Sequence, residues 1–178
     1  ITPVGSNTGV TLTDNSLAID YIGIVSVRVT QSGNNIYNMA APRVVEINIL
    51  KGQTTLSSFG IPDKLIIDDD FQITPPSSNR DGVFQYTSSD PSIATVSGDQ
   101  ITITGIGSTV ITATQLDSDK YSSSSISAVF IVNDLDTDGD GIGDTLDTDD
   151  DNDGYSDVNE NLCLSDPLDP LSTPLDTD

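Results

Sequence analysis

The sequence predicts an all-β fold, a β-sandwich followed by an irregular acidic segment. Short runs rich in Thr, Val and Ile alternate with turns at spacings of roughly 8 to 12 residues, which is typical of sandwiches. Residues 1–49 resemble residues 85–133, which indicates a repeated domain. Of the 28 acidic residues, 16 lie in residues 134–178. No stretch shows a helical period.

The complete domain spans residues 50–133 and contains the clearest strand signals. We expect β-strands at residues 53–59, 64–67, 71–74, 83–88, 93–96, 101–104, 109–115 and 128–132. The tight turn at Ser97-Gly98-Asp99 predicts a hairpin with Ile101 and Ile103 on one face of the returning strand.

The repeat has a period of 84 residues. A gapless shift places residues 27–31 on residues 111–115, Tyr37 on Tyr121, and Val45 and Ile47 on Val129 and Ile131. Residues 1–49 are therefore the C-terminal part of a first copy. We expect its opening half to precede Ile1 and the chain to be a fragment of a longer protein.

Residues 86–98 (YTSSDPSIATVSG) and 105–115 (GIGSTVITATQ) resemble bacterial immunoglobulin-like domains of group 2. The resemblance implies an immunoglobulin-like Greek-key sandwich, repeated in tandem along extracellular or cell-surface bacterial proteins. Such domains serve as spacers, adhesins and appendages of enzymes, so the resemblance does not fix the function.

Charge is distributed unevenly along the chain. The net charge is −22, and all six basic residues lie in residues 1–133. Residues 134–178 thus carry a net charge of −16, which repels nucleic acid and anionic membranes and attracts divalent cations. No apolar run approaches the ~20 residues of a membrane-spanning helix.

Residues 134–178 hold two adjacent loops with the spacing of an EF-hand calcium loop. Such a loop supplies oxygens from positions 1, 3, 5, 9 and 12 and the carbonyl of position 7, with Gly at position 6. The first loop supplies Asp136, Asp138, Asp140, Ile142 by its carbonyl, Asp144 and Asp147. The second supplies Asp149, Asp151, Asp153, Tyr155 by its carbonyl, Asp157 and Glu160. We expect two or more Ca²⁺ ions.

Two alternatives accompany this calcium hypothesis. An acidic run is often a solvated, disordered linker. The repeated placement of glycine and an apolar residue after the third Asp favours metal binding. The register can also shift, with Asp134, Asp150 or Asn152 as substitute ligands, and Asp147 can bridge two sites.

Only Thr148 separates the two loops, so no helix fits between them. The segment resembles thrombospondin type 3 repeats, which implies loops wound around a row of calcium ions with little regular structure. In this resemblance residues 161–170 form the connector, and residues 176–178 open the next pair of loops. Cys163 is the only cysteine, either a passive thiol or the partner of a cysteine outside this chain.

Catalysis finds no support, because the chain lacks His, a nucleophile motif and a phosphate loop. We expect a non-catalytic spacer of a large secreted or cell-surface bacterial protein, in which calcium stiffens the acidic segment. The expected partners are neighbouring repeats of the same polypeptide. Alternative functions are an adhesin that binds a cell-surface protein or glycan, and a filament subunit or secretion-system passenger.

Overall fold

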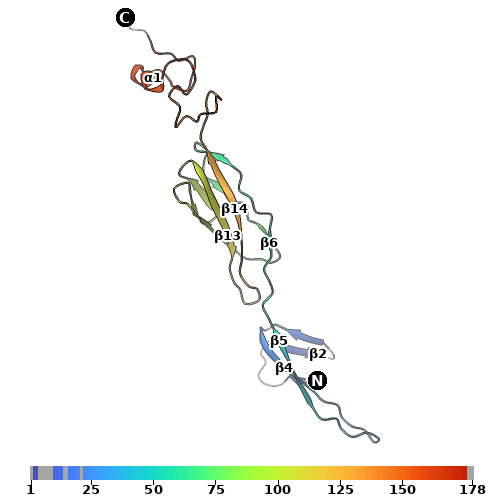
Figure 1. Cartoon of the computed structure of the whole chain (residues 1–178). Coiled ribbons are helices and arrows are strands. Elements are labelled where there is room, and N and C mark those ends of the chain that lie inside the picture. Colours follow the sequence, from blue (N-terminus) through green and yellow to red (C-terminus); the bar gives the residue numbers. More distant parts are fainter. Residues whose placement is uncertain (1, 4–9, 14–15, 21, 176–178) are drawn as a thin grey trace. The chain divides into compact units, whose positions relative to one another are not determined.

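The computed structural model describes residues 2–3, 10–13, 16–20 and 22–175. The chain divides into two compact units. The first comprises residues 1–55, 78–83 and 115–124, and the second comprises residues 56–77, 84–114 and 125–178. Figure 1 shows that strands dominate the chain until the acidic segment begins. The predicted loop start at residues 176–178 lies outside the described residues.

Most of a β-sandwich lies in the second unit. One sheet has the order β10-β13-β14-β7, with bounds Phe84–Ser88, Gly107–Gln115, Ser124–Asn133 and Lys64–Leu65. The facing sheet has the order β11-β12-β8, with bounds Ala94–Ser97, Gln100–Ile103 and Phe71–Gln72. Leu56–Ser57 (β6) pairs with Ser77–Ser78 (β9). The predicted strands are present, although several are shorter than expected and β9 was not predicted.

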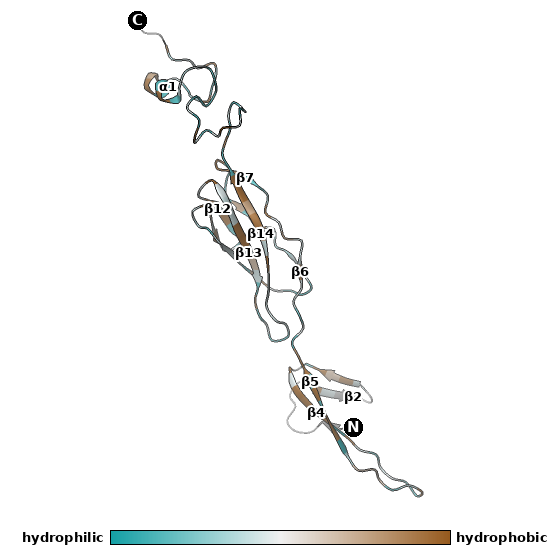
Figure 2. Cartoon of the chain, in the orientation of Figure 1, coloured by the Kyte–Doolittle hydropathy of each residue, from teal (hydrophilic) through white to brown (hydrophobic). Residues whose placement is uncertain are grey.

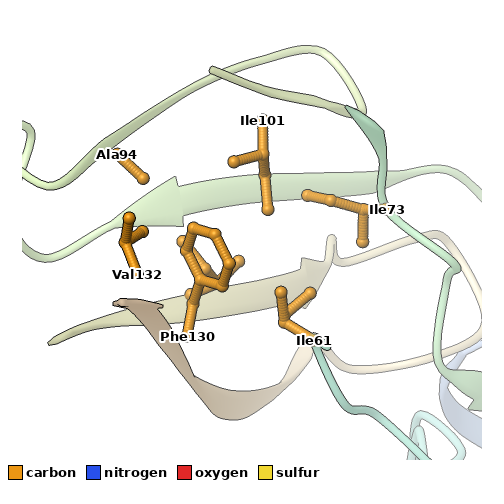
Figure 3. Close-up of a cluster of buried hydrophobic side chains, with 7 residues drawn as sticks. Ile61, Ile73, Ala94, Ile101, Phe130 and Val132 are labelled. Carbon is orange, nitrogen blue, oxygen red and sulfur yellow. The ribbon is translucent and has the colours of Figure 1, made fainter. Parts of the chain in front are cut away.

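The core of the sandwich is a cluster of apolar side chains from both sheets and from the segments that follow β6 and β8. Its buried members are Ile61, Ile73, Ala94, Ile101, Ile111, Phe130 and Val132. Figure 3 shows six of them converging on one another between the strands. The Phe71 ring meets Phe130 edge-on, with centroids 5.6 Å apart. Burying an aliphatic or aromatic side chain contributes about 1.5–3 kcal/mol, so this cluster is the main source of the domain's stability.

Strand β13 shows how alternation fixes the faces of the sheet. Thr109, Ile111, Ala113 and Gln115 are buried at every second position. On the other face, Thr112 bonds Ser127 and Thr114 bonds Ser125 across to β14, each at 2.9 Å. These bonds place Ile111 opposite Ala128. Figure 2 shows the hydrophobic colouring that β14 carries along much of its length.

The strands of the first unit repeat those of the sandwich. β1 (Thr2–Pro3), β2 (Val10–Thr13), β3 (Ser16–Ile19) and β4 (Gly23–Val29) lie 84 residues before β10, β11, β12 and β13. Gly23 and Gly107 open equivalent strands with φ of 133° and 134°, a backbone region that favours glycine. The repeated strand positions support the internal repeat predicted from the sequence.

Strand β5 (Arg43–Ile49) departs from the gapless alignment. Val27, the counterpart of Ile111, lies opposite Val45 in the β4–β5 ladder. Val45 therefore corresponds to Ala128, a shift of 83 residues. The gapless alignment, which places Val45 on Val129, was therefore wrong by one residue in β5. A one-residue slip moves every side chain of a strand to the opposite face, so the pairing of the strands decides the register.

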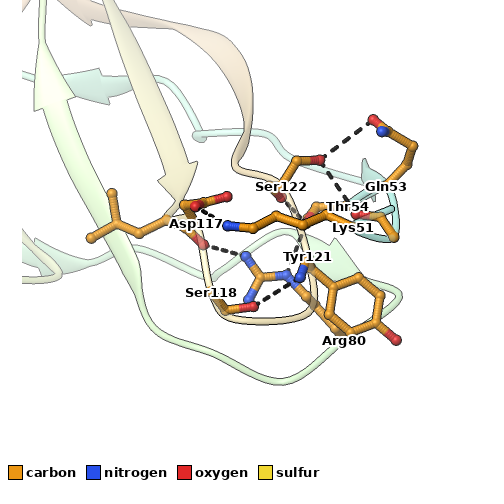
Figure 4. A network of polar contacts seen from close by, with 10 residues as sticks. Lys51, Gln53, Thr54, Arg80, Asp117, Ser118, Tyr121 and Ser122 are labelled. Carbon is orange, nitrogen blue, oxygen red and sulfur yellow. Dashed lines mark hydrogen bonds and ion pairs between the residues drawn. The ribbon is translucent and has the colours of Figure 1, made fainter. Parts of the chain in front are cut away.

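Polar side chains of the first unit form a network around Arg80 (Figure 4). The Arg80 Nε donates to Thr54 Oγ1 at 2.8 Å, and the guanidinium lies 5.6 Å from the centre of the Tyr121 ring. Lys51 forms an ion pair with Asp117 nearby. Cation–π contact and charged hydrogen bonds hold residues 51–54 to the loops at 78–83 and 115–124.

The acidic segment begins after β14 and has no strand among its described residues. It consists of turns and one short helix, α1 (Asp157–Cys163). The expectation that no stretch would be helical was therefore wrong at α1. No helix in the part of the chain that the structure describes has the length and apolar character of a membrane span.

Candidate metal centre

The two predicted loops share a set of hydrogen bonds from backbone N–H groups to carboxylates. In both, the glycine at position 6 donates to the carboxylate at position 1, and each distance is 3.2 Å: Gly141 to Asp136, and Gly154 to Asp149. The residue at position 7 donates to the carboxylate at position 5, and each distance is 2.8 Å: Ile142 to Asp140, and Tyr155 to Asp153. Positions 1, 5, 6 and 7 thus make equivalent contacts in the two loops.

Position 9 also has the same role in both loops. Asp144 accepts from the Thr137 N–H and Asp157 accepts from the Asp150 N–H, both at 2.9 Å. The position 9 carboxylates thus close each loop onto its second residue. Position 9 of an EF-hand loop often reaches the ion through a water molecule, and this orientation is compatible with that role.

Glycine at position 6 is required by the backbone. Gly141 has φ of 97° and Gly154 has φ of 96°, a region that L side chains rarely adopt. The turn at this residue bends the chain so that the three carboxylates before it approach one another. In each loop, oxygens from three residues lie within 4.8 Å of one another: Asp136, Asp138 and Asp140 in the first, and Asp149, Asp151 and Asp153 in the second.

The second loop is the better-formed site because its carboxylates are buried. Glu160 has no exposed surface and Asp151 is 7% exposed. The oxygens without a hydrogen-bond partner are Asp149 Oδ1, Asp150 Oδ1, Asp151 Oδ2, Asp153 Oδ2 and both Glu160 oxygens. Burying a carboxylate without a partner is costly, so such a cluster is stable when a cation is bound.

Burial and mutual repulsion raise three pKa values in this cluster. Desolvation is the largest cause at each, and neighbouring carboxylates raise the three pKa values further. The pKa of Asp150 rises to about 6, with Asp157 and Asp144 as the largest charge contributions. The pKa values of Asp151 and Glu160 are also raised, and the largest charge contributions come from Asp153 and Asp151 respectively. A divalent cation would reverse these shifts, since it favours the ionised carboxylates.

Helix α1 places Glu160 against the second loop. Ser156 caps the helix by accepting from the Asn159 N–H at 3.4 Å, and Leu164 ends it in the left-handed conformation. Sequence reasoning missed this helix, although a serine followed by an aspartate in the first turn is a start signal. A capped turn of helix can carry the position 12 side chain back to the loop.

The first loop is open by comparison. Asp136 and Asp140 are exposed, and Asp138 is partly exposed. At position 12, Asp147 Oδ1 accepts from the Thr148 and Asp149 N–H groups at 2.6 Å and 3.1 Å, so this oxygen is used to cap the following turn. Asp134, a substitute ligand in the sequence interpretation, instead accepts from Thr145.

The side chains of the two position 7 residues are exposed, Ile142 at 48% and Tyr155 at 44%. Only their carbonyls were predicted to bind an ion. Cys163 lies exposed on α1 as a free thiol.

Comparison with known proteins addresses the sandwich. Residues 74–117 match the family model described as the intimin immunoglobulin-like domain. Curated protein sequences give no match. One matching solved structure is Drosophila N-cadherin EC1-4, at 10% identity and a TM-score of 0.37, covering 68% of this chain and 36% of that chain. The family match ends before the acidic segment. The strand arrangement, the alternating core and the family match together identify an all-β, immunoglobulin-like sandwich, as the sequence predicted.

Proposed function

We propose that this chain is a calcium-stabilised structural module of a bacterial cell-surface protein related to adhesins. The match of residues 74–117 to the intimin immunoglobulin-like domain supports the cell-surface and adhesin-related part. The carboxylate of Glu160 carries the calcium part, because it is buried beside Asp149, Asp151 and Asp153 with neither oxygen hydrogen-bonded. The immunoglobulin-like repeats serve as spacers next to this segment.

The ligand chemistry favours Ca²⁺ over other cations. The clustered groups are all carboxylates, and the chain has no His. Oxygen-only sites suit Ca²⁺, Mg²⁺ and Mn²⁺ rather than zinc or copper. The free oxygens of Asp149, Asp151, Asp153 and Glu160, with the carbonyl of Tyr155, supply the six to eight ligands that Ca²⁺ takes. Mg²⁺ prefers octahedral sites that keep several waters, so it fits this set less well.

Calcium would act by coupling metal binding to order. Without a cation, the carboxylates of the second loop repel one another, and no bound ion links Glu160 on α1 to the loop. With a cation, the loop and the helix are held together through one centre. Sites with dissociation constants of about 10⁻⁴–10⁻³ M are typical of extracellular modules, so millimolar external calcium would fill them.

A calcium titration of the full chain tests this proposal with a matched pair of variants. The chain has two glutamates, Glu160 at the site and the exposed Glu46 on β5. Glu160→Gln removes the bidentate charge and should weaken the second site by more than the about 100-fold seen for outer-shell residues. Glu46→Gln removes the same charge elsewhere and should leave calcium binding unchanged.

Amide signals of Gly141 and Gly154 report the two loops separately by NMR, because each amide donates to the position 1 carboxylate of its loop. The calcium part of the proposal would be wrong if the wild-type chain did not bind calcium, or if magnesium ordered the acidic segment equally well. Equal losses in both glutamate variants would show that the effect is one of net charge alone.

A second candidate function is recognition, and the intimin match is the observation that favours it. In this alternative the sandwich binds a host surface protein or a glycan. A binding screen with the full chain, in calcium and in chelator, distinguishes the two. A specific partner whose binding survives chelation would favour the adhesin function, and negative results across both classes would favour the spacer.

A further inference from the structure

The inner face of β4 and β5 is less covered in the first copy of the repeat than the equivalent face is in the complete domain. Val29 is 42% exposed, whereas its counterpart Ala113 has no exposed surface. Val45 is 49% exposed, whereas its counterpart Ala128 packs against the buried core. Apolar side chains of the first copy are therefore open at positions that the complete domain covers.

Val29 and Val45 line a pocket of about 360 Å³ in the first copy. The other residues that line it are Gln31, Ala40, Ala41 and Arg43. Gln31 is exposed, and its counterpart Gln115 is 1% exposed. The Gln115 side chain accepts from the Ser78 hydroxyl at 2.6 Å. In the complete domain, a residue of β9 therefore covers the glutamine that lies open in the first copy.

The turn between β4 and β5 shows the same difference at a tyrosine. The Asn34 N–H donates to the Tyr37 carbonyl at 2.9 Å. In the complete domain the Ser118 N–H donates to the Tyr121 carbonyl at the same distance, so the two turns are equivalent. Tyr121 is partly buried, and the Arg80 guanidinium lies 5.6 Å from its ring centre (Figure 4). Tyr37 is 71% exposed.

One segment of the complete domain supplies these contacts. Residues 52–80 include Ser78 and Arg80, and they also contribute Ile61 and Ile73 to the buried core. Strand β7 of this segment pairs in parallel with the edge of β14. The counterpart of β14 is β5, which pairs with β4 alone among the described residues. The first copy therefore presents an apolar face and a strand edge that residues 52–80 cover in the complete domain.

We propose that this surface of the first copy is a docking site for an extended segment of another immunoglobulin-like repeat, with the sequence pattern of residues 52–80. The docked segment adds a strand parallel to β5. It places two apolar side chains on the inner face of β4 and β5, as Ile61 and Ile73 pack in the cluster with Phe130 (Figure 3). In strand addition, backbone hydrogen bonds give affinity and side-chain pockets give specificity. The inference goes beyond the proposed function, because it does not depend on calcium.

The repeat also decides which occupant fits this surface. Within the complete domain, residues 52–80 already form the interface with strands equivalent to β4 and β5. A second copy of this chain keeps its own residues 52–80 in its own sandwich, so they are already occupied. A segment from a further repeat meets the same face with the same chemistry, which makes it the occupant that the surface fits best.

A synthetic peptide with the sequence of residues 52–80, added to the full chain, tests this inference. Calorimetry measures the affinity of the peptide, and NMR spectra of the valine methyl groups locate its binding site. The peptide should bind saturably and shift the signals of Val29 and Val45, while the signal of Val132 in the complete domain stays unchanged. Binding without these shifts, or no binding, would overturn the inference.

Two variants of the peptide give a matched comparison. In the complete domain Ile73 is 5% exposed and Ile67 is 66% exposed. Ile73→Asp should weaken binding by about 10-fold or more, because it puts a charge where an isoleucine is buried. Ile67→Asp should bind as the unchanged peptide does. The protein is wild type in every sample, so neither variant alters its folding.

Equal affinities of the two peptide variants would contradict the inference. The full chain without peptide is the second control, measured over a range of concentrations. Its Val29 and Val45 signals should not change with concentration. Self-association that shifts these two signals would assign the face to a second copy of the chain and would also overturn the inference.

Discussion

The two acidic loops share a sequence pattern and a hydrogen-bond pattern, yet they differ at the residue that closes them. In the second loop, Glu160 is carried by α1 and is fully buried. In the first loop, Asp147 is one methylene shorter and caps the turn that starts the second loop. The twelve-position pattern is therefore enough to bring the carboxylates of positions 1, 3 and 5 together in each loop. The element after position 12 decides whether they become a buried cluster.

Among variants that keep the charge of both loops, the largest expected effect comes from shortening the closing residue of the second loop. Glu160→Asp keeps the charge but withdraws the carboxylate by one methylene, so it cannot offer both oxygens to an ion held by Asp149, Asp151 and Asp153. We expect calcium affinity at the Gly154 signal to fall by about 10- to 100-fold. The Gly141 signal in the same titration is the control. An unchanged Gly154 titration would show that charge at position 160 suffices.

A rise in pH should have opposite effects on the order of the ion-free acidic segment and on its affinity for calcium. Burial raises the pKa of Asp150 from 3.8 to about 6, so the folded ion-free segment holds a proton in this window that the unfolded segment releases. Its order should therefore decrease as pH rises from about 4 to 6. Calcium competes with these protons, so calcium affinity should increase over the same window.

Circular dichroism at several pH values measures how the order of the ion-free segment changes with pH. Calcium titrations at the same pH values measure how the calcium affinity changes. Replacing Asp150 with Asn removes the carboxyl group whose pKa is raised to about 6, and it should flatten the pH dependence of the ion-free form. An ion-free segment that gains order with rising pH would contradict the burial on which this prediction depends.

A smaller effect is expected from the cap of α1. Ser156→Ala removes the side-chain acceptor of the Asn159 N–H, which costs about 1 kcal/mol of helix stability. If docking of α1 accompanies binding, that cost corresponds to a loss of about fivefold in calcium affinity. The loss should be confined to the second loop. An equal loss in the first loop would mean that the helix stabilises the segment as a whole.

Much of the fold and of the loop geometry could be predicted from the sequence, because local rules govern loops and strands. The positive φ at Gly141 and Gly154 needs glycine, and buried alternation along β13 needs Ile111 and Ala113 on one face. Both requirements are visible in the order of residues. The immunoglobulin-like fold and the spacing of the carboxylates followed from such rules.

Other features depend on contacts that the order of residues does not display. The register of β5 depends on which residue lies opposite Val27, and a one-residue insertion between β4 and β5 leaves no local mark. Helix α1 is short, and its turns carry too few apolar residues for a period to stand out. The burial of Glu160 depends on α1 folding back onto the second loop. It could not be predicted from the sequence because the helix was not predicted.

The smallest effect is expected from giving the first loop the residue of the second. Asp147→Glu adds the reach that bidentate binding requires. It also removes the short carboxylate that accepts from the Thr148 and Asp149 N–H groups, and each such hydrogen bond contributes about 0.5–1.5 kcal/mol. No helix follows position 147 to hold the longer side chain, since Asp149 already begins the second loop. The gain in calcium binding from the longer side chain should nearly cancel the loss of the two hydrogen bonds. The Gly141 signal should therefore titrate with calcium close to the wild type. A first loop that rose to the affinity of the second would show that residue type alone makes the difference, and that the helix behind Glu160 is dispensable.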